Sequence, residues 1–163
     1  MLLSLTMLLV AVLVASSSSA TQPLVLRPER AYGVRPELLG FLDWWRIHGP
    51  FRITIGEHGG LRTSDTVQLA LYLKGASDAR TLRDTPHGRG AALDLYRVTR
   101  WTERGAVLEV ALADHAAFGA IGAAAKAYGL AWGGDWQKPD EPHVQLPDWR
   151  SLPFQPVGTE RVA

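Results

Sequence analysis

The chain has 163 residues, of which 47% are hydrophobic and 20% charged, and its formal net charge is +1. This composition is typical of a soluble globular domain, and a charge so close to zero gives no indication of nucleic acid as a partner. There is no cysteine, which excludes disulfides, thiolate metal sites and a cysteine nucleophile. Any metal ion must therefore be held by His, Asp or Glu.

The first residues, "MLLSLTMLLVAVLVASSSSA", predict export from the cytoplasm. The uninterrupted apolar run is shorter than the about 20 residues that span a bilayer, and small residues follow it as a cleavage site would. No lysine or arginine precedes it. We expect residues 1–20 to be a signal peptide or, if uncleaved, a membrane anchor, which would be the only membrane contact. Residues 21–36, rich in proline and arginine, are predicted to be a linker or wrapping segment.

Two helices and a strand are predicted in the first half of the chain. Apolar residues recur at helical spacing in "ELLGFLDWWRIH", and Gly49 is a plausible end for that helix. "FRITI", residues 51–55, alternates apolar and polar residues as a half-buried strand does. Ser64 or Asp65 can cap a second helix that runs through residues 68–73 and ends at Gly75.

The second half predicts a strand over residues 91–99, a turn and strand in "TERGAVLEVAL", and a small-residue helix over residues 116–128. "LAW" and "HVQL" are short strands, and the last fifteen or so residues show no strong pattern. This order favours an α+β domain, residues 37–163, with a small antiparallel sheet and helices packed on one side.

Three residues far apart in the sequence form a candidate metal site. His87 and Asp94 bracket a glycine-rich turn in "HGRGAALD", and His143 lies on a later predicted strand. Two imidazoles and one carboxylate, with a fourth position open, suit a catalytic Zn²⁺ ion. Each residue taken alone is more often an ordinary solvated or hydrogen-bonded side chain, and the spacing is not a common zinc motif.

"WGGDWQKPDEPHVQ" places further carboxylates next to His143. A carboxylate beside an open zinc position can take a proton from water and pass it to a leaving amine. Asp140 and Glu141 are both candidates for this role. A polar loop with structural tryptophans is the alternative interpretation of the same stretch.

Three ordered motifs resemble the zinc peptidases related to D-alanyl-D-alanine carboxypeptidases, peptidase family M15. "TPHGRGAALD" is similar to SxHxxGxAxD, with Thr85 in place of serine. "WGGDWQKPDEPHVQ" resembles the WGGDW…DxPHxQ signature of the branch that contains L-alanyl-D-glutamate endopeptidases, including endolysins. "GGLRTSDTVQLALYLKG" is similar to SGYRTxxxQxxLYxxG. The pieces occur in the family's order between about Phe51 and Leu146, and they imply the fold shared by these peptidases and hedgehog domains.

The resemblance implies a role for each matching residue. His87, Asp94 and His143 become the zinc ligands, and Asp140 becomes the catalytic acid and base. Arg62 is expected to polarise the scissile carbonyl or to hold a substrate carboxylate, since its charge is fixed and its donors form a planar fork.

Neighbouring positions are expected to assist the site. Gln68 and Thr85 are expected to support it, Gln145 to bond to a ligand or line the cleft, and Glu141 falls outside the motif. Leu61 and Pro139 replace aromatic residues of the family pattern and are expected to alter substrate contacts only.

The implied function is zinc-dependent hydrolysis of peptidoglycan stem peptides by an exported monomer in the periplasm or cell wall. The signature favours an L-alanyl-D-glutamate endopeptidase, acting in wall remodelling or as an endolysin. A D-alanyl-D-alanine carboxypeptidase or dipeptidase is the alternative. A zinc-containing binding module without activity, as among the hedgehog signalling domains, is a third possibility, which the complete set of ligands, carboxylate and arginine disfavours.

Overall fold

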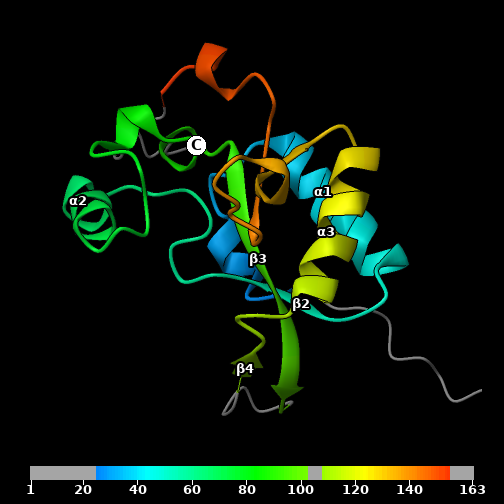
Figure 1. Cartoon of the computed structure of the whole chain (residues 1–163). Helices are drawn as coiled ribbons and strands as arrows, with labels where there is room; N and C mark the ends of the chain where they lie inside the picture. Colours follow the sequence, from blue (N-terminus) through cyan, green and yellow to red (C-terminus); the bar gives the residue numbers. More distant parts are fainter. Residues whose placement is uncertain (1–24, 103–107, 155–163) are drawn as a thin grey trace, which may run out of the picture.

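A computed structural model describes residues 25–102 and 108–154 of the chain (Figure 1). The predicted signal peptide or anchor, residues 1–20, lies outside the described residues. None of the helices in these two ranges is both long enough and apolar enough to cross a membrane.

A six-stranded sheet forms the centre of the domain. Its strands are β1 (Val25–Leu26), β2 (Ile53–Ile55), β3 (Ala92–Trp101), β4 (Leu108–Val110), β5 (Ala131–Trp132) and β6 (His143–Gln145). They are arranged in the order β1-β2-β3-β6-β5, and β4 also pairs with β3. The long strand β3 is therefore the element that joins the sheet together.

The predicted α+β class is confirmed, with one difference in strand direction. All the pairs except one are antiparallel, as expected, but β1 runs parallel to β2. The chain between these two strands includes a helix, and a parallel pair needs such a long crossover. A two-residue strand carries no periodicity, so β1 could not be predicted from the local pattern.

The helices are α1 (Pro36–His48), α2 (Asp65–Leu73) and α3 (His115–Ala127). In Figure 1, α1 and α3 lie together on one side of β3, as expected, while α2 lies apart on the other side. The predicted helix ends agree with the structure. Ser64 caps α2 by accepting the backbone N–H of Val67 at 3.3 Å, and Gly49 follows the last residue of α1.

The core lies between the sheet and the α1–α3 pair. Leu93 and Leu95 of β3 are fully buried there, beside Phe41 of α1 and Ile121 of α3. Because side chains alternate along a strand, Asp94 between the two leucines points to the opposite face of the sheet. The apolar core thus fixes which face of β3 is available for polar chemistry.

Candidate metal centre and its cleft

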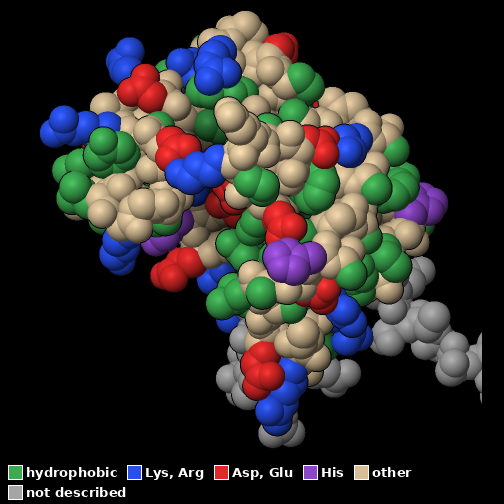
Figure 2. Space-filling model, in the orientation of Figure 1, with side chains coloured by type: hydrophobic (Ala, Val, Ile, Leu, Met, Phe, Trp, Pro, Cys, Tyr) green, Lys and Arg blue, Asp and Glu red, His purple; other side chains and the backbone are tan. Residues whose placement is uncertain are grey.

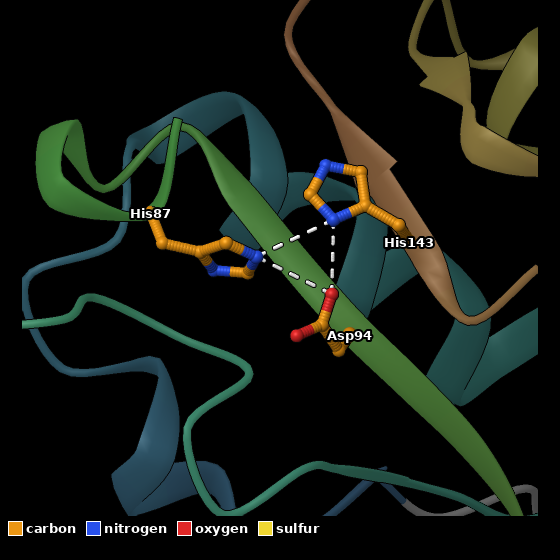
Figure 3. A group of neighbouring side chains, drawn as sticks. All are labelled: His87, Asp94 and His143. Carbon is orange, nitrogen blue, oxygen red and sulfur yellow. Dashed lines mark hydrogen bonds and ion pairs between the residues drawn. The ribbon is translucent and has the colours of Figure 1, made fainter. Parts of the chain in front are cut away.

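The structure brings His87, Asp94 and His143 together on one side of the sheet (Figure 3). Asp94 Oδ1 lies 3.0 Å from His143 Nδ1 and 3.3 Å from His87 Nε2. The two histidine nitrogens are 3.3 Å apart. His87 and His143 are buried, with 3% and 5% of their surface exposed. The three side chains predicted to share an ion therefore converge on one point.

Strand pairing positions two of these residues. β3 and β6 pair antiparallel with Asp94 directly opposite His143, so the side chains of both project from the same face of the sheet. His87 comes from the short 3₁₀ helix η3 (His87–Arg89), just before β3. Gly90 ends that turn with φ +64°, a left-handed conformation that glycine adopts without strain. The predicted glycine bend is present and aims His87 at the strand that follows.

Thr85 holds the turn that carries His87. Its hydroxyl donates to the carbonyl of Leu82 at 3.1 Å and accepts the backbone N–H of Gly88 at 2.9 Å. The residue is buried, with 2% of its surface exposed. Thr85 thus supports the turn, as expected, because both of these hydrogen bonds of its hydroxyl are made within the segment that carries His87.

Each histidine has an acceptor that fixes its tautomer. His87 donates its Nδ1 hydrogen to the carbonyl of Gly60 at 2.9 Å, which leaves a lone pair on Nε2. His143 donates its Nε2 hydrogen to Oε1 of Gln145 at 3.0 Å, which leaves a lone pair on Nδ1. Hydrogen bonds of this kind typically orient histidines that ligate metal ions. Gln145 was expected to bond to a ligand, and it does; the carbonyl of Gly60 carries no side-chain signal in the sequence.

These residues fit a zinc ion. Ligands about 2.0–2.1 Å from a tetrahedral ion stand roughly 3.3 Å from one another, and the three ligand atoms are separated by 3.0–3.3 Å. Two imidazole lone pairs and a carboxylate oxygen that face one point form a donor set that a divalent cation satisfies. The set leaves a fourth position, as catalytic zinc sites do.

The electrostatics of the cluster favour the protonation states that a metal ion needs at Asp94 and His87, but not at His143. Burial raises the pKa of Asp94, but His87 and His143 outweigh this effect and hold it well below its ordinary value. Burial lowers the pKa of His87. For His143 burial acts in the same direction, yet the hydrogen bond and charge of Asp94 outweigh it and raise the pKa. Asp94 is thus ionised and His87 neutral near pH 7, and the proton that His143 binds is the one a metal ion displaces.

Arg62 lies behind the metal ligands. One of its terminal nitrogens donates to Asp94 Oδ2 at 3.2 Å and the other to Gln68 Oε1 at 3.2 Å. Its Nε donates to the carbonyl of His58 at 2.8 Å. Only 9% of the side chain is exposed, and burial lowers its pKa. The structure therefore shows Arg62 holding the oxygen of Asp94 that does not face the histidines, a contact the sequence did not predict.

Asp140 and Glu141 are neighbours in sequence but face different surroundings. Asp140 Oδ2 lies 3.9 Å from His143 Nδ1, and 52% of its side chain is exposed. The pKa of Asp140 is raised by partial burial and by the charge of Asp94, which makes its carboxylate a stronger base. Glu141 instead pairs with His115 Nδ1 at 2.6 Å, an interaction the sequence did not reveal. Asp140 is consequently the carboxylate nearer the ligand cluster.

The loop that carries Asp140 approaches the sheet closely at Gly133. The backbone N–H of Asp140 donates to the Gly133 carbonyl at 2.9 Å. A Cβ atom on Gly133 would lie 2.3 Å from the carbonyl oxygen of Asp140. Trp132 also holds the loop in place, because its indole N–H donates to the carbonyl of Glu141 at 2.7 Å. The glycine and tryptophan of "WGGDW" thus place Asp140 beside His143.

A cleft of about 860 Å³ opens over the cluster. Arg62, Asp140 and the three ligand residues line it. Further lining residues come from the loop after α2, from the loop before Asp140 and from the segment after β6: Asp78, Lys138, Pro139, Trp136, Trp149 and Arg150. The exposed residues Asp78 and Lys138 pair at 2.8 Å, which links two of these walls. A substrate that enters the cleft would meet the ligand cluster and Asp140 together.

An α+β domain that aims two imidazoles and a carboxylate at one point, with another carboxylate beside them in a cleft, has the donor set of a hydrolytic metal centre. Residues 79–146 match the family model described as D-alanyl-D-alanine carboxypeptidase, which confirms the resemblance to the M15 peptidases. The matched segment contains His87, Asp94, Asp140 and His143, while Arg62 precedes it. No curated protein matches the chain. The family match supports a peptidase related to peptidoglycan.

Proposed function

We propose that the protein is a zinc-dependent peptidase that hydrolyses the stem peptides of peptidoglycan outside the cytoplasm. One observation carries the proposal: His87, Asp94 and His143 present three ligand atoms 3.0–3.3 Å apart, and Asp140 lies beside them in the same cleft. A zinc ion bound there supplies Lewis-acid polarisation of the scissile carbonyl and lowers the pKa of water.

Asp140 takes the proton from the attacking water and then delivers it to the departing nitrogen. Its carboxylate suits both steps because it is partly solvated, has a raised pKa and lies 3.9 Å from His143 Nδ1. Glu141 is bound to His115 and is not the proposed base.

Arg62 has donors left for the substrate. A guanidinium has five N–H groups, and the contacts with His58, Gln68 and Asp94 use three of them. The remaining donors would stabilise the developing oxyanion or bind a substrate carboxylate, while the other three keep the group in place. Arg62 would thus act on both Asp94 and the substrate.

We propose that the bond cleaved is L-alanyl-D-glutamate. The cleft volume, about 860 Å³, lies near the upper end of the about 300–1,000 Å³ typical of ligand pockets. A cleft of this size has room for a peptide, and the choice of bond is supported by "WGGDWQKPDEPHVQ", which resembles the signature of the L-alanyl-D-glutamate endopeptidases. The family description favours the alternative, removal of the terminal D-alanine or D-Ala-D-Ala dipeptide.

Mass spectrometry of muropeptides digested with the zinc-loaded protein tests both hypotheses about the cleaved bond. The proposal expects stems released as chains that begin with D-glutamate, and free D-alanine would instead support the carboxypeptidase. Turbidity of purified cell walls, measured beside a zinc-binding assay, tests the binding module: zinc bound without any lysis or peptide release would refute a hydrolase.

A further inference from the structure

Gln68 is an unusual residue in α2. Its side chain is fully buried, while the residues around it on the helix are exposed or only partly buried. Leu69, Tyr72 and Leu73 are 37%, 42% and 74% exposed, and Figure 2 shows hydrophobic side chains gathered over α2 at the left of the molecule. Because α2 exposes leucines and buries the amide of Gln68, this amide is expected to have a specific role in the structure.

The amide of Gln68 is bonded at both ends. Its oxygen accepts from a terminal nitrogen of Arg62 at 3.2 Å. Its nitrogen donates to the hydroxyl of Ser77 at 2.9 Å and to the carbonyl of Ala79 at 2.5 Å. The amide therefore connects Arg62 with the loop after α2, whose residues 77–79 line the cleft.

Arg62 extends this connection to the metal ligands. Its second terminal nitrogen donates to Asp94 Oδ2 at 3.2 Å, while Asp94 Oδ1 faces His87 and His143. Because the guanidinium is planar, fixing one terminal nitrogen at Gln68 also fixes the direction of the other. The orientation of the Asp94 carboxylate thus depends on an amide that does not touch it.

We propose that Gln68 is a positioning residue that acts through Arg62 to hold Asp94 in its metal-binding orientation, and that it anchors loop 77–79 as one wall of the cleft. This inference rests on the metal centre of the proposed function. It assigns Gln68 two separable effects, one on metal affinity through its oxygen and one on substrate binding through its nitrogen.

Two substitutions of Gln68 separate its effect on zinc affinity from its effect on substrate binding. Gln68→Met keeps the length and approximate volume of the side chain but removes both halves of the connection. Loss of a residue that orients a metal ligand typically weakens metal binding about 10–100-fold, and we expect a zinc dissociation constant raised by that factor. Gln68→Glu keeps an acceptor for Arg62 and loses the donors to Ser77 and Ala79. We expect its zinc affinity to stay within about threefold of wild type and its KM to rise, with kcat little changed.

Leu73→Ala is the matched control on the same helix, since Leu73 is 74% exposed and lies outside the cleft. Its zinc affinity and KM should equal those of wild type. Zinc affinity is measured by competition with a chromophoric chelator on full-length protein, with circular dichroism to give the folded fraction. A residue with only a structural role would lower the folded fraction while leaving zinc affinity per folded molecule unchanged.

A double-substitution cycle tests the route through Arg62. In an Arg62→Ala background, Gln68→Met should weaken zinc binding no further, because the intermediary is already absent. Folded Gln68→Met with wild-type zinc affinity, or equal losses with and without Arg62, would overturn the proposal. If Gln68→Met does not fold, Gln68→Glu decides: weakened zinc binding overturns the inference, and retained affinity with raised KM supports it. If zinc affinity changes as expected in the Gln68 variants but the wild-type protein hydrolyses no peptide, the peptidase activity is refuted and the positioning role of Gln68 stands.

Discussion

Replacing Asp140 by asparagine separates proton transfer from metal binding. Asparagine has the same shape as aspartate but cannot accept the proton of an attacking water. Asp140 Oδ2 lies 3.9 Å from His143 Nδ1 and is not among the three converging ligand atoms. We therefore expect Asp140→Asn to retain zinc and to lose most of its turnover.

The expected losses of turnover and of zinc affinity in Asp140→Asn differ in size. A positioned general acid or base contributes about 10²–10⁴-fold, which corresponds to about 3–5 kcal/mol of activation free energy. For zinc affinity, unit charges about 4 Å apart interact by about 1 kcal/mol in a water-like medium, and half of the Asp140 side chain is exposed to such a medium. Because a zinc ion carries two charges, this interaction is about 2 kcal/mol, and removing the Asp140 charge should thus weaken zinc binding only about 30-fold or less.

The assay is kcat at saturating zinc on purified muropeptides, with zinc affinity measured by calorimetry on the same samples. Glu141→Gln is the matched control, because Glu141 is adjacent in sequence but pairs with His115. It should keep turnover within a few-fold of wild type. Asp140→Asn with more than about a tenth of wild-type kcat would refute the proposed role of Asp140, and a large loss in Glu141→Gln would transfer that role to Glu141.

Four further outcomes are expected. Zinc at 100 times its dissociation constant should raise the melting temperature by about 5–10 °C, since it adds about 2.7 kcal/mol, and a chelator should reverse the shift in a thermal scan. Gly133→Ala should lower kcat about 100-fold, because its Cβ would lie 2.3 Å from the Asp140 carbonyl oxygen and displace the loop; unchanged kinetics would contradict this reasoning. Lys138→Ala should leave the free energy of unfolding in urea nearly unchanged, since its pair with Asp78 is exposed. Leu93→Ala, at a fully buried position, should destabilise the fold by about 2–5 kcal/mol in the same measurement.

The helices and the longer strand were predictable because they carry strong local signals. α1 and α3 have apolar residues at helical spacing, and Ser64 caps α2 as its position suggested. β1 was not predictable, since two residues have no period and the strand exists only through pairing with β2. The local sequence pattern also did not predict that α2 lies away from the other helices.

For the site, the sequence predicted the residue types but not their connections. The motifs pointed to His87, Asp94 and His143, and the structure places their ligand atoms within 4.8 Å of one another. The opposing register of β3 and β6 is a long-range property that no local pattern reveals. The same holds for Arg62, which was expected to face the substrate and is seen bound to Asp94 and Gln68.

The contacts that support the three candidate ligands indicate that the proposed metal site is formed before any ion binds. Asp94 and His143 are paired residues of a ladder, so backbone hydrogen bonds fix their separation. His87 lies on a turn, the weaker support, but the Gly60 carbonyl and Thr85 hold its ring and backbone. With both tautomers fixed and the ligand atoms already at tetrahedral spacing, little conformational entropy remains for a metal ion to remove. Zinc binding should therefore change the described fold very little, and its stabilisation should come from the new bonds and not from ordering of the chain.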